Sequence, residues 1–158
     1  MTGLELNKFL LKRQVRTAFG TPDQVNAMPV LHQQQILMLD TNTTKQAYQA
    51  IHDWQMLSSD MLGNIPFADE RFQNIQKHQI SDDAILKKWL YQRPVAFADR
   101  VYVLPVFGGA DESAIYTTWK MIVKYAPVVF SGDNTVVVDV LGRWCLYYHH
   151  DDLLTFAH

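Results

Sequence analysis

The chain has 158 residues, of which 48% are hydrophobic and 19% are charged, and its formal net charge is −2. This length suits one domain with a sizeable core, and the low Gly and Pro content excludes a linker-rich or disordered chain. The slight excess of acidic residues argues against a general nucleic-acid binder.

Residues 2–19 are predicted to form a basic amphipathic helix. Thr2 is a suitable N-cap, and Glu5 stands three residues later as its capping-box partner. Four cations lie between the two apolar patches of this helix: Lys8, Lys12, Arg13 and Arg16. The charged face is either the solvated side of a docked helix or a contact surface for an acidic partner or anionic lipid. We select Lys12 and Arg16 as its candidate partner-binding residues.

A short second helix is predicted after Gly20, with Thr21 as its N-cap and Pro22 in its first turn. Pro29 ends this helix. Residues 30–39 contain a continuous apolar run that fits either a strand or the buried end of a helix. The three consecutive glutamines before that run favour a helix.

Three further helices are predicted before residue 94. The first begins at the capping cluster 41–44, and its apolar stripe is formed by Ala47, Ala50, Ile51, Trp54 and Leu57. The second covers 68–78, with Phe72 and Ile75 facing inward. The third has Ser81 as its N-cap. Its buried face consists of Ile85, Leu86, Trp89 and Leu90.

Strands are predicted mainly in the last third of the chain. Residues 101–104 are β-branched, aromatic and apolar, and Pro105 places the end of this strand at or beyond a sheet edge. A helix capped by Asp111 or Ser113 follows. Its predicted stripe is Ile115, Trp119, Ile122 and Ala126. It leads into a strand at 128–130.

A β-hairpin is predicted near the C-terminus, with Leu141-Gly142 as its two-residue loop. This loop fixes the register, which pairs Val140 with Arg143, Asp139 with Trp144, Val138 with Cys145 and Val137 with Leu146. Both faces are largely apolar, so we expect the hairpin to be covered on both sides or central in its sheet. Cys145, the lone cysteine, is expected to be a buried and inert thiol.

This order of elements predicts a single α+β domain over residues 1–158. Its N-terminal half is helical, and its C-terminal half holds a small, mostly antiparallel sheet of about three to five strands. Residues 1–60 could alternatively form a helical subregion. No run reaches the roughly 18 apolar residues of a membrane span, and no secretory signal is apparent, so we expect a cytoplasmic protein.

The strongest chemical candidate is the segment His149-His150-Asp151-Asp152, because His and Asp serve both as metal ligands and as acid–base groups. If the strand continues through His149 and His150, however, their side chains point to opposite faces. A site would then use only one of them. Alternatively, Asp151 or Asp152 caps a short helical turn at 153–156. No established metal or nucleophile motif is present, and no cofactor or metal is expected.

The C-terminal region is acidic, with Asp133, Asp139, Asp151 and Asp152 against Arg143. Such a surface could meet a basic partner through electrostatic steering, or it could attract the basic N-terminal residues within the fold. The candidate partner-binding residues are Asp133, Asp151, Asp152, His150, Lys12 and Arg16.

One further indication comes from a C-terminal pattern: Trp119…Tyr125, Ser131-Gly132-Asp133, Trp144, Leu146, Tyr148-His149-His150-Asp151 and Phe156. It resembles the C-terminal ends of small bacterial domains of unknown function, some of which are similar to immunity proteins that neutralise toxins of rival cells. The resemblance implies an intracellular, non-enzymatic protein that acts by binding, with its aromatic positions mostly in the core.

The resulting hypothesis is a non-enzymatic cytosolic module that binds another protein. In its most specific form, the partner is a toxin domain that the chain neutralises. Nucleic acid is not expected as a partner, and neither is a membrane span. The alternative is a small enzyme or metal-dependent domain that uses His149 to Asp152.

Overall fold

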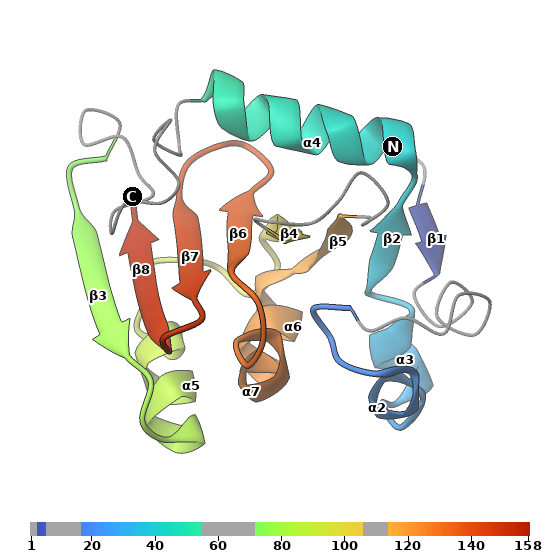
Figure 1. The fold of residues 1–158 in the computed structure, drawn as a ribbon, viewed down its shortest axis with the longest axis horizontal. Helices are drawn as coiled ribbons and strands as arrows, with labels where there is room; N and C mark the ends of the chain where they lie inside the picture. The colour runs from blue at the N-terminus through green and yellow to red at the C-terminus, as the bar shows by residue number, and fades with distance from the viewer. Residues whose placement is uncertain (1–2, 6–16, 55–71, 106–113) are drawn as a thin grey trace.

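The structure is a computed structural model that describes residues 3–5, 17–54, 72–105 and 114–158. In this part of the chain, eight strands form one sheet in the order β1-β2-β5-β4-β6-β7-β8-β3 (Figure 1). The strands are β1 (Gly3–Glu5), β2 (Leu37–Leu39), β3 (Ile75–Gln79), β4 (Arg100–Pro105), β5 (Ile115–Thr118), β6 (Thr135–Asp139), β7 (Cys145–His149) and β8 (Leu153–Ala157). Each neighbouring pair is antiparallel.

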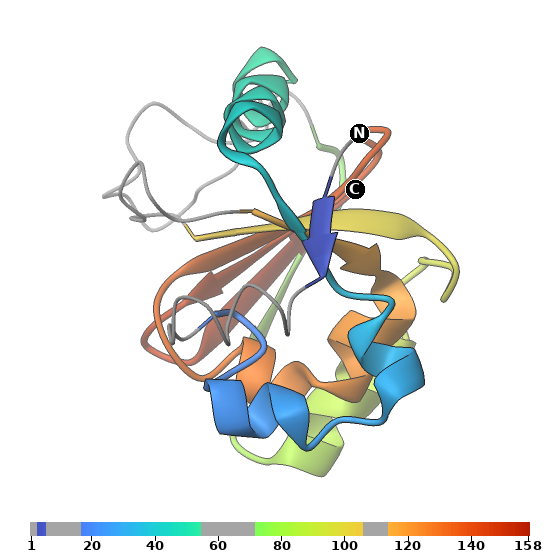
Figure 2. The same ribbon diagram turned by 90° about the vertical axis from the view of Figure 1, so that its right-hand side faces the viewer.

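The helices are α2 (Pro22–Asn26), α3 (Val30–Gln33), α4 (Thr41–Asp53), α5 (Asp83–Tyr91), α6 (Trp119–Lys124) and α7 (Ala126–Val129). Figure 2 shows that α4 covers one face of the sheet, whereas α2, α3, α5, α6 and α7 lie on the other face. The predicted α+β class and the mostly antiparallel sheet are therefore confirmed. None of the helices in the described residues is both long and apolar enough to cross a membrane.

The predicted N-terminal helix over 2–19 is wrong at both of its described ends. Residues 3–5 form β1, which pairs with β2, and residues 17–20 form a turn closed by a bridge between Thr17 and Gly20. Strand pairing with a distant segment overrides the local helical pattern. The cations Lys12 and Arg16 lie outside the described residues.

The short second helix is confirmed in α2. Thr21 is its N-cap, and the Thr21 and Gln24 side chains form a reciprocal capping box. The segment 30–39, for which a helix was favoured, instead divides into α3 and β2. The clear helix after residue 40 is α4, and its N-cap is Asp40.

Two predicted helices are strands in part. Residues 75–79 form β3, whose only ladder among the described residues is with β8, and Ile75 is exposed rather than inward-facing. Residues 115–118 form β5, and Thr118 then caps α6. In both segments apolar residues three or four apart match a helical stripe, whereas the strand partners lie outside the segment: β8 for β3, and β2 and β4 for β5.

Three further expectations about the sheet are corrected. The sheet has eight strands rather than about three to five, because β1, β2 and β3 come from the first half of the chain. The predicted strand at 128–130 is mostly helix α7, with Pro127 in its first turn. Pro105 ends β4, which is a central strand between β5 and β6 and not an edge strand.

The β6–β7 hairpin has the predicted register, with Val138 opposite Cys145 and Val137 opposite Leu146. Both of its faces are buried, as expected. Val137 and Leu146 belong to the larger core cluster, which also contains residues of α2, α5, α6 and α7. Val138 and Cys145 belong to the second cluster, which also contains residues of α4. The hairpin is therefore central to the sheet and is covered on both sides.

Candidate functional site

The turn between β7 and β8 carries the polar segment that the sequence singled out. β7 ends at His149, and Asp152 adopts a left-handed backbone conformation with φ 61°. Asp is one of the residues that tolerate this conformation. The expected helical turn at 153–156 is wrong, because this segment is strand β8 and pairs with both β7 and β3. Asp152 instead accepts a hydrogen bond from the Tyr148 hydroxyl at 3.1 Å.

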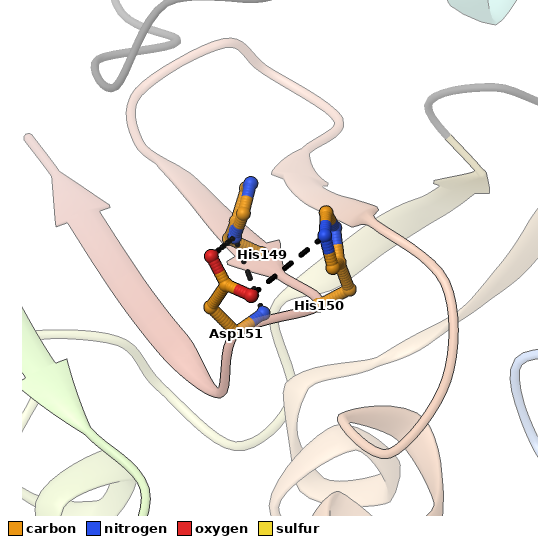
Figure 3. Close-up of side chains that lie close together, drawn as sticks. All are labelled: His149, His150 and Asp151. Carbon is orange, nitrogen blue, oxygen red and sulfur yellow. Dashed lines mark hydrogen bonds and ion pairs between the residues drawn. The ribbon is translucent and has the colours of Figure 1, made fainter.

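His149, His150 and Asp151 converge at this turn (Figure 3). His149 Nδ1 lies 3.3 Å from Asp151 Oδ2, and His150 Nε2 lies 3.7 Å from Asp151 Oδ1. The two imidazole rings are 4.2 Å apart between centroids. The histidines would point to opposite faces only if the strand continued through both of them, and β7 ends at His149.

Asn134 orients His150 through two hydrogen bonds. Its side chain is only 4% exposed, and its Oδ1 accepts hydrogen bonds from the backbone N–H of His150 at 2.7 Å and from His150 Nδ1 at 2.9 Å. The His150 backbone N–H can only donate, so the amide atom that it contacts is the oxygen, and the Asn134 Nδ2 then donates to the Tyr147 hydroxyl at 3.0 Å. His150 Nδ1 therefore carries a proton, and Nε2 presents its lone pair toward Asp151.

The other acidic candidates divide between surface and interior. Asp133, Asp151 and Asp152 are exposed; Asp133 directly precedes Asn134, so these residues lie near one end of the sheet. Asp139 is fully buried and forms an ion pair with Arg143. It therefore does not contribute to an acidic surface.

A second candidate region lies between α5 and α6. It is a pocket of about 260 Å³ lined by Lys87, Tyr91, Phe97, Lys120, Val123 and Lys124. The Tyr91 and Phe97 rings meet edge to face, with their centroids 5.2 Å apart. Tyr91 is 62% exposed and Phe97 is 44% exposed. This region was not predicted from the sequence, because Phe97 and Lys120 belong to separate segments of the chain.

The pocket is cationic. Among the residues that the structure describes, no carboxylate lies within ion-pair distance of Lys87, Lys120 or Lys124. Burial, together with the positive charges of Lys124 and Lys120, lowers the pKa of nearby His32. A ligand bound here would therefore meet aromatic surface and positive charge together.

Cys145 is fully buried, as expected, and burial raises the pKa of its thiol well above the ordinary value. A buried thiol in an apolar setting is a poor nucleophile. It belongs to the core cluster under α4, so it takes no part in either candidate region.

Comparison with protein-family models, with curated proteins and with solved structures found no significant match. These comparisons therefore do not test the C-terminal resemblance to small bacterial domains of unknown function. Several aromatic residues of the C-terminal pattern are core residues. The ring centroids of Trp119 and Trp144 are 5.2 Å apart, and those of Trp144 and Phe156 are 5.6 Å apart. These rings contribute to cohesion and not to a binding surface.

Proposed function

We propose that this chain is a non-enzymatic cytosolic module that binds another protein through the pocket between α5 and α6. The partner segment is acidic and carries an aromatic or aliphatic anchor side chain. The observation that supports this most directly is the exposed Tyr91–Phe97 pair with three lysines around it.

The aromatic pair favours a protein partner. Large aromatic side chains that stay exposed in the free protein are frequent energetic centres of protein interfaces. Tyr91 and Phe97 contact each other instead of packing into the core, so their outer faces are available to an anchor. The pocket volume of about 260 Å³ falls below the usual range for small-molecule sites, and it suits one or two side chains of a peptide.

The charge around the pocket selects the partner. Lys87, Lys120 and Lys124 come from two helices and surround the same opening. Carboxylates of an acidic segment would complement these ammonium groups, which steers encounter and disfavours basic partners. The acidic segment is therefore the matching chemistry for this surface.

Toxin neutralisation is the most specific form of this proposal. It is supported by the resemblance of the C-terminal pattern, and the toxin would supply the acidic anchor segment. The acidic end of the sheet, with Asp133, Asp151 and Asp152 beside His150, would then offer a second contact for basic residues of the same toxin.

The binding proposal can be tested with a fluorescently labelled peptide of sequence Asp-Glu-Phe-Glu-Asp, whose anisotropy is measured against increasing protein concentration. We expect binding that weakens about tenfold when Tyr91 is replaced by Ser, and that also weakens in the Lys120→Gln, Lys124→Gln double variant. Lys88→Gln is the matched control, because Lys88 lies on α5 but does not line the pocket.

Two peptide controls separate the contributions of anchor and charge. A peptide with Ser in place of Phe removes the anchor, and a peptide with Asn and Gln in place of the acids removes the charge. Equal binding of all three peptides, or no binding of the acidic aromatic peptide, would contradict the proposal.

The toxin form has its own test. A toxin encoded beside the gene for this chain would be produced in bacteria together with the wild-type chain or with the Tyr91→Ser variant. Wild-type chain should restore growth and the variant should not. If the wild-type chain and the variant restored growth equally, the pocket would have no role in toxin recognition.

A further inference from the structure

The turn between β7 and β8 presents three metal-ligating side chains on one exposed surface. We propose that His149, His150 and Asp151 bind a divalent transition-metal cation of the zinc type. This site is separate from the pocket between α5 and α6, so the inference does not depend on peptide binding at that pocket. A bound metal ion would compete with the second contact that the toxin form of the proposed function places at the same turn.

The spacing of the ligand atoms suits such an ion. A tetrahedral zinc site with metal–ligand bonds near 2.1 Å has neighbouring ligand atoms roughly 3.4 Å apart. The two His-to-carboxylate distances are 3.3 and 3.7 Å, and the three candidate ligand atoms all lie within 4.8 Å of one another. The two imidazole planes are inclined to each other by 30°, with their centroids 4.2 Å apart, and both rings lie beside the same carboxylate.

His150 is prepared for coordination by its hydrogen bonds. Metal-binding histidines usually donate their second ring N–H to a fixed acceptor, which sets the tautomer and the ring orientation. Asn134 Oδ1 is this acceptor for His150 Nδ1, and Asn134 is itself held by Tyr147. Nε2 of His150 is thereby left free to bind a cation.

His149 adds a reason for a cation to bind. The backbone N–H of Asp151 donates to His149 Nδ1 at 3.2 Å, so Nδ1 acts as an acceptor. The same atom also faces Asp151 Oδ2 at 3.3 Å, which brings two electron-rich atoms together. A metal ion bound at Nδ1 would replace the Asp151 N–H bond and would place positive charge between His149, His150 and the Asp151 carboxylate.

The ligand set indicates the class of metal. Two imidazoles with one carboxylate favour zinc, nickel, cobalt or copper, whereas magnesium and calcium prefer oxygen ligands throughout. Three protein ligands leave the remaining coordination positions to water. Asp133 and Asp152 add negative charge near the same turn, which favours any cation.

The chain supplies its own control. The other histidines lie elsewhere: His32 contacts Tyr125, His78 stacks on Trp89, His158 packs against Phe156, and His52 pairs with Asp53. His52 and Asp53 are an exposed pair on α4 that resembles half of the proposed site. One imidazole beside one carboxylate should bind metal much more weakly than the complete set of three ligands.

The test uses the full chain without a histidine tag in isothermal titration calorimetry with Zn²⁺, Ni²⁺ and Mg²⁺. We expect Zn²⁺ and Ni²⁺ to bind with one ion per chain, and Mg²⁺ not to bind. His149→Gln, His150→Gln and Asp151→Asn should each weaken binding at least about tenfold, whereas His52→Gln should not change it. Wild-type affinity in the turn variants, or an equal loss in His52→Gln, would overturn the proposal.

A second measurement needs no substitution and remains valid if a variant fails to fold. Paramagnetic Ni²⁺ is added to the wild-type chain, and the imidazole proton resonances are followed by NMR. The signals of His149 and His150 should broaden at lower metal concentration than that of His52. Broadening of His52 first, or of all six histidines together, would overturn the site.

Discussion

The carboxylate of Asp139 lies fully inside the protein and is bound by both arms of the Arg143 guanidinium, with Nε to Oδ2 at 2.7 Å and the second nitrogen to Oδ1 at 2.9 Å. The backbone N–H of Arg143 also donates to Oδ2 at 3.0 Å. These bonds close the loop of the β6–β7 hairpin. The hydrogen bond to Asp139 and its charge raise the pKa of Arg143.

Replacing Arg143 by Ala should lower the melting temperature, because it leaves the buried Asp139 carboxylate without its charged partner. Arg143→Lys should have an intermediate effect, since it keeps the charge but loses the two-pronged geometry. Thermal unfolding followed by circular dichroism gives the order of the three proteins. An alanine variant as stable as the wild type would contradict this account of the loop.

Gly142 should not tolerate a side chain. Its φ is +73°, and a Cβ at this position would lie 2.9 Å from the Trp54 ring. We expect Gly142→Ala to reduce the free energy of unfolding by more than about 1 kcal/mol in urea titrations. In the Trp54→Ala background the same substitution should cost less, because only the backbone strain remains. Equal costs in both backgrounds would show that the ring does not restrict this turn.

Asp82, and not the predicted Ser81, is the N-cap of α5, where its carboxylate accepts from the backbone N–H of Ala84 at 2.7 Å and of Ile85 at 3.1 Å. Asp82→Ala should reduce the free energy of unfolding by about 0.5–2 kcal/mol. Ser81→Ala is the neighbouring control and should stay within about 0.5 kcal/mol of wild type. A larger loss of unfolding free energy in Ser81→Ala than in Asp82→Ala would indicate that Ser81 is the N-cap.

Stability should fall in alkaline solution because of Tyr148. Burial, followed by the hydrogen bond to Asp152 and the charge of Asp152, raises the pKa of the Tyr148 hydroxyl to about 12. The unfolded phenol ionises near pH ~10, so above that pH the unfolded state releases a proton that the folded state retains. The free energy of unfolding should therefore decrease between about pH 10 and 12.

The Tyr148→Phe variant isolates this contribution. Its urea unfolding should depend less steeply on pH in the same range. Burial also raises the pKa values of Tyr102, Tyr125 and Tyr147, so some slope should remain. If the free energy of unfolding of the variant fell as steeply with pH as that of the wild type, the loss of stability at alkaline pH would come from the other tyrosines.

The elements predicted well are those specified by neighbouring residues. The β6–β7 register followed from one short loop, and α2 followed from a Thr21 cap before a proline. β3 was missed because its partner β8 lies far along the chain, and β5 was missed because its four residues lead directly into helix α6. β3 is also an exposed edge strand, so it lacks the alternating apolar pattern by which strands are recognised.

The candidate site shows the same division. The sequence drew attention to His149 and His150, but it could not show that β7 ends between them. Asn134 was missed as a functional residue, because nothing in its own turn relates it to His150. The lysine–aromatic pocket was missed too, since helix periodicity shows which residues share a face but not which two helices meet.

The position of β8 between β7 and β3 also constrains how the molecule is made. Residues 75–79 emerge from the ribosome long before residues 153–157, with which they pair. Until that late segment arrives, the early one has no ladder partner among the described strands. The sheet therefore cannot be completed progressively during synthesis, because β3 gains this ladder only after residues 153–157 have been made. Such long-range closure is slow, and it exposes apolar surface to chaperones in the interval.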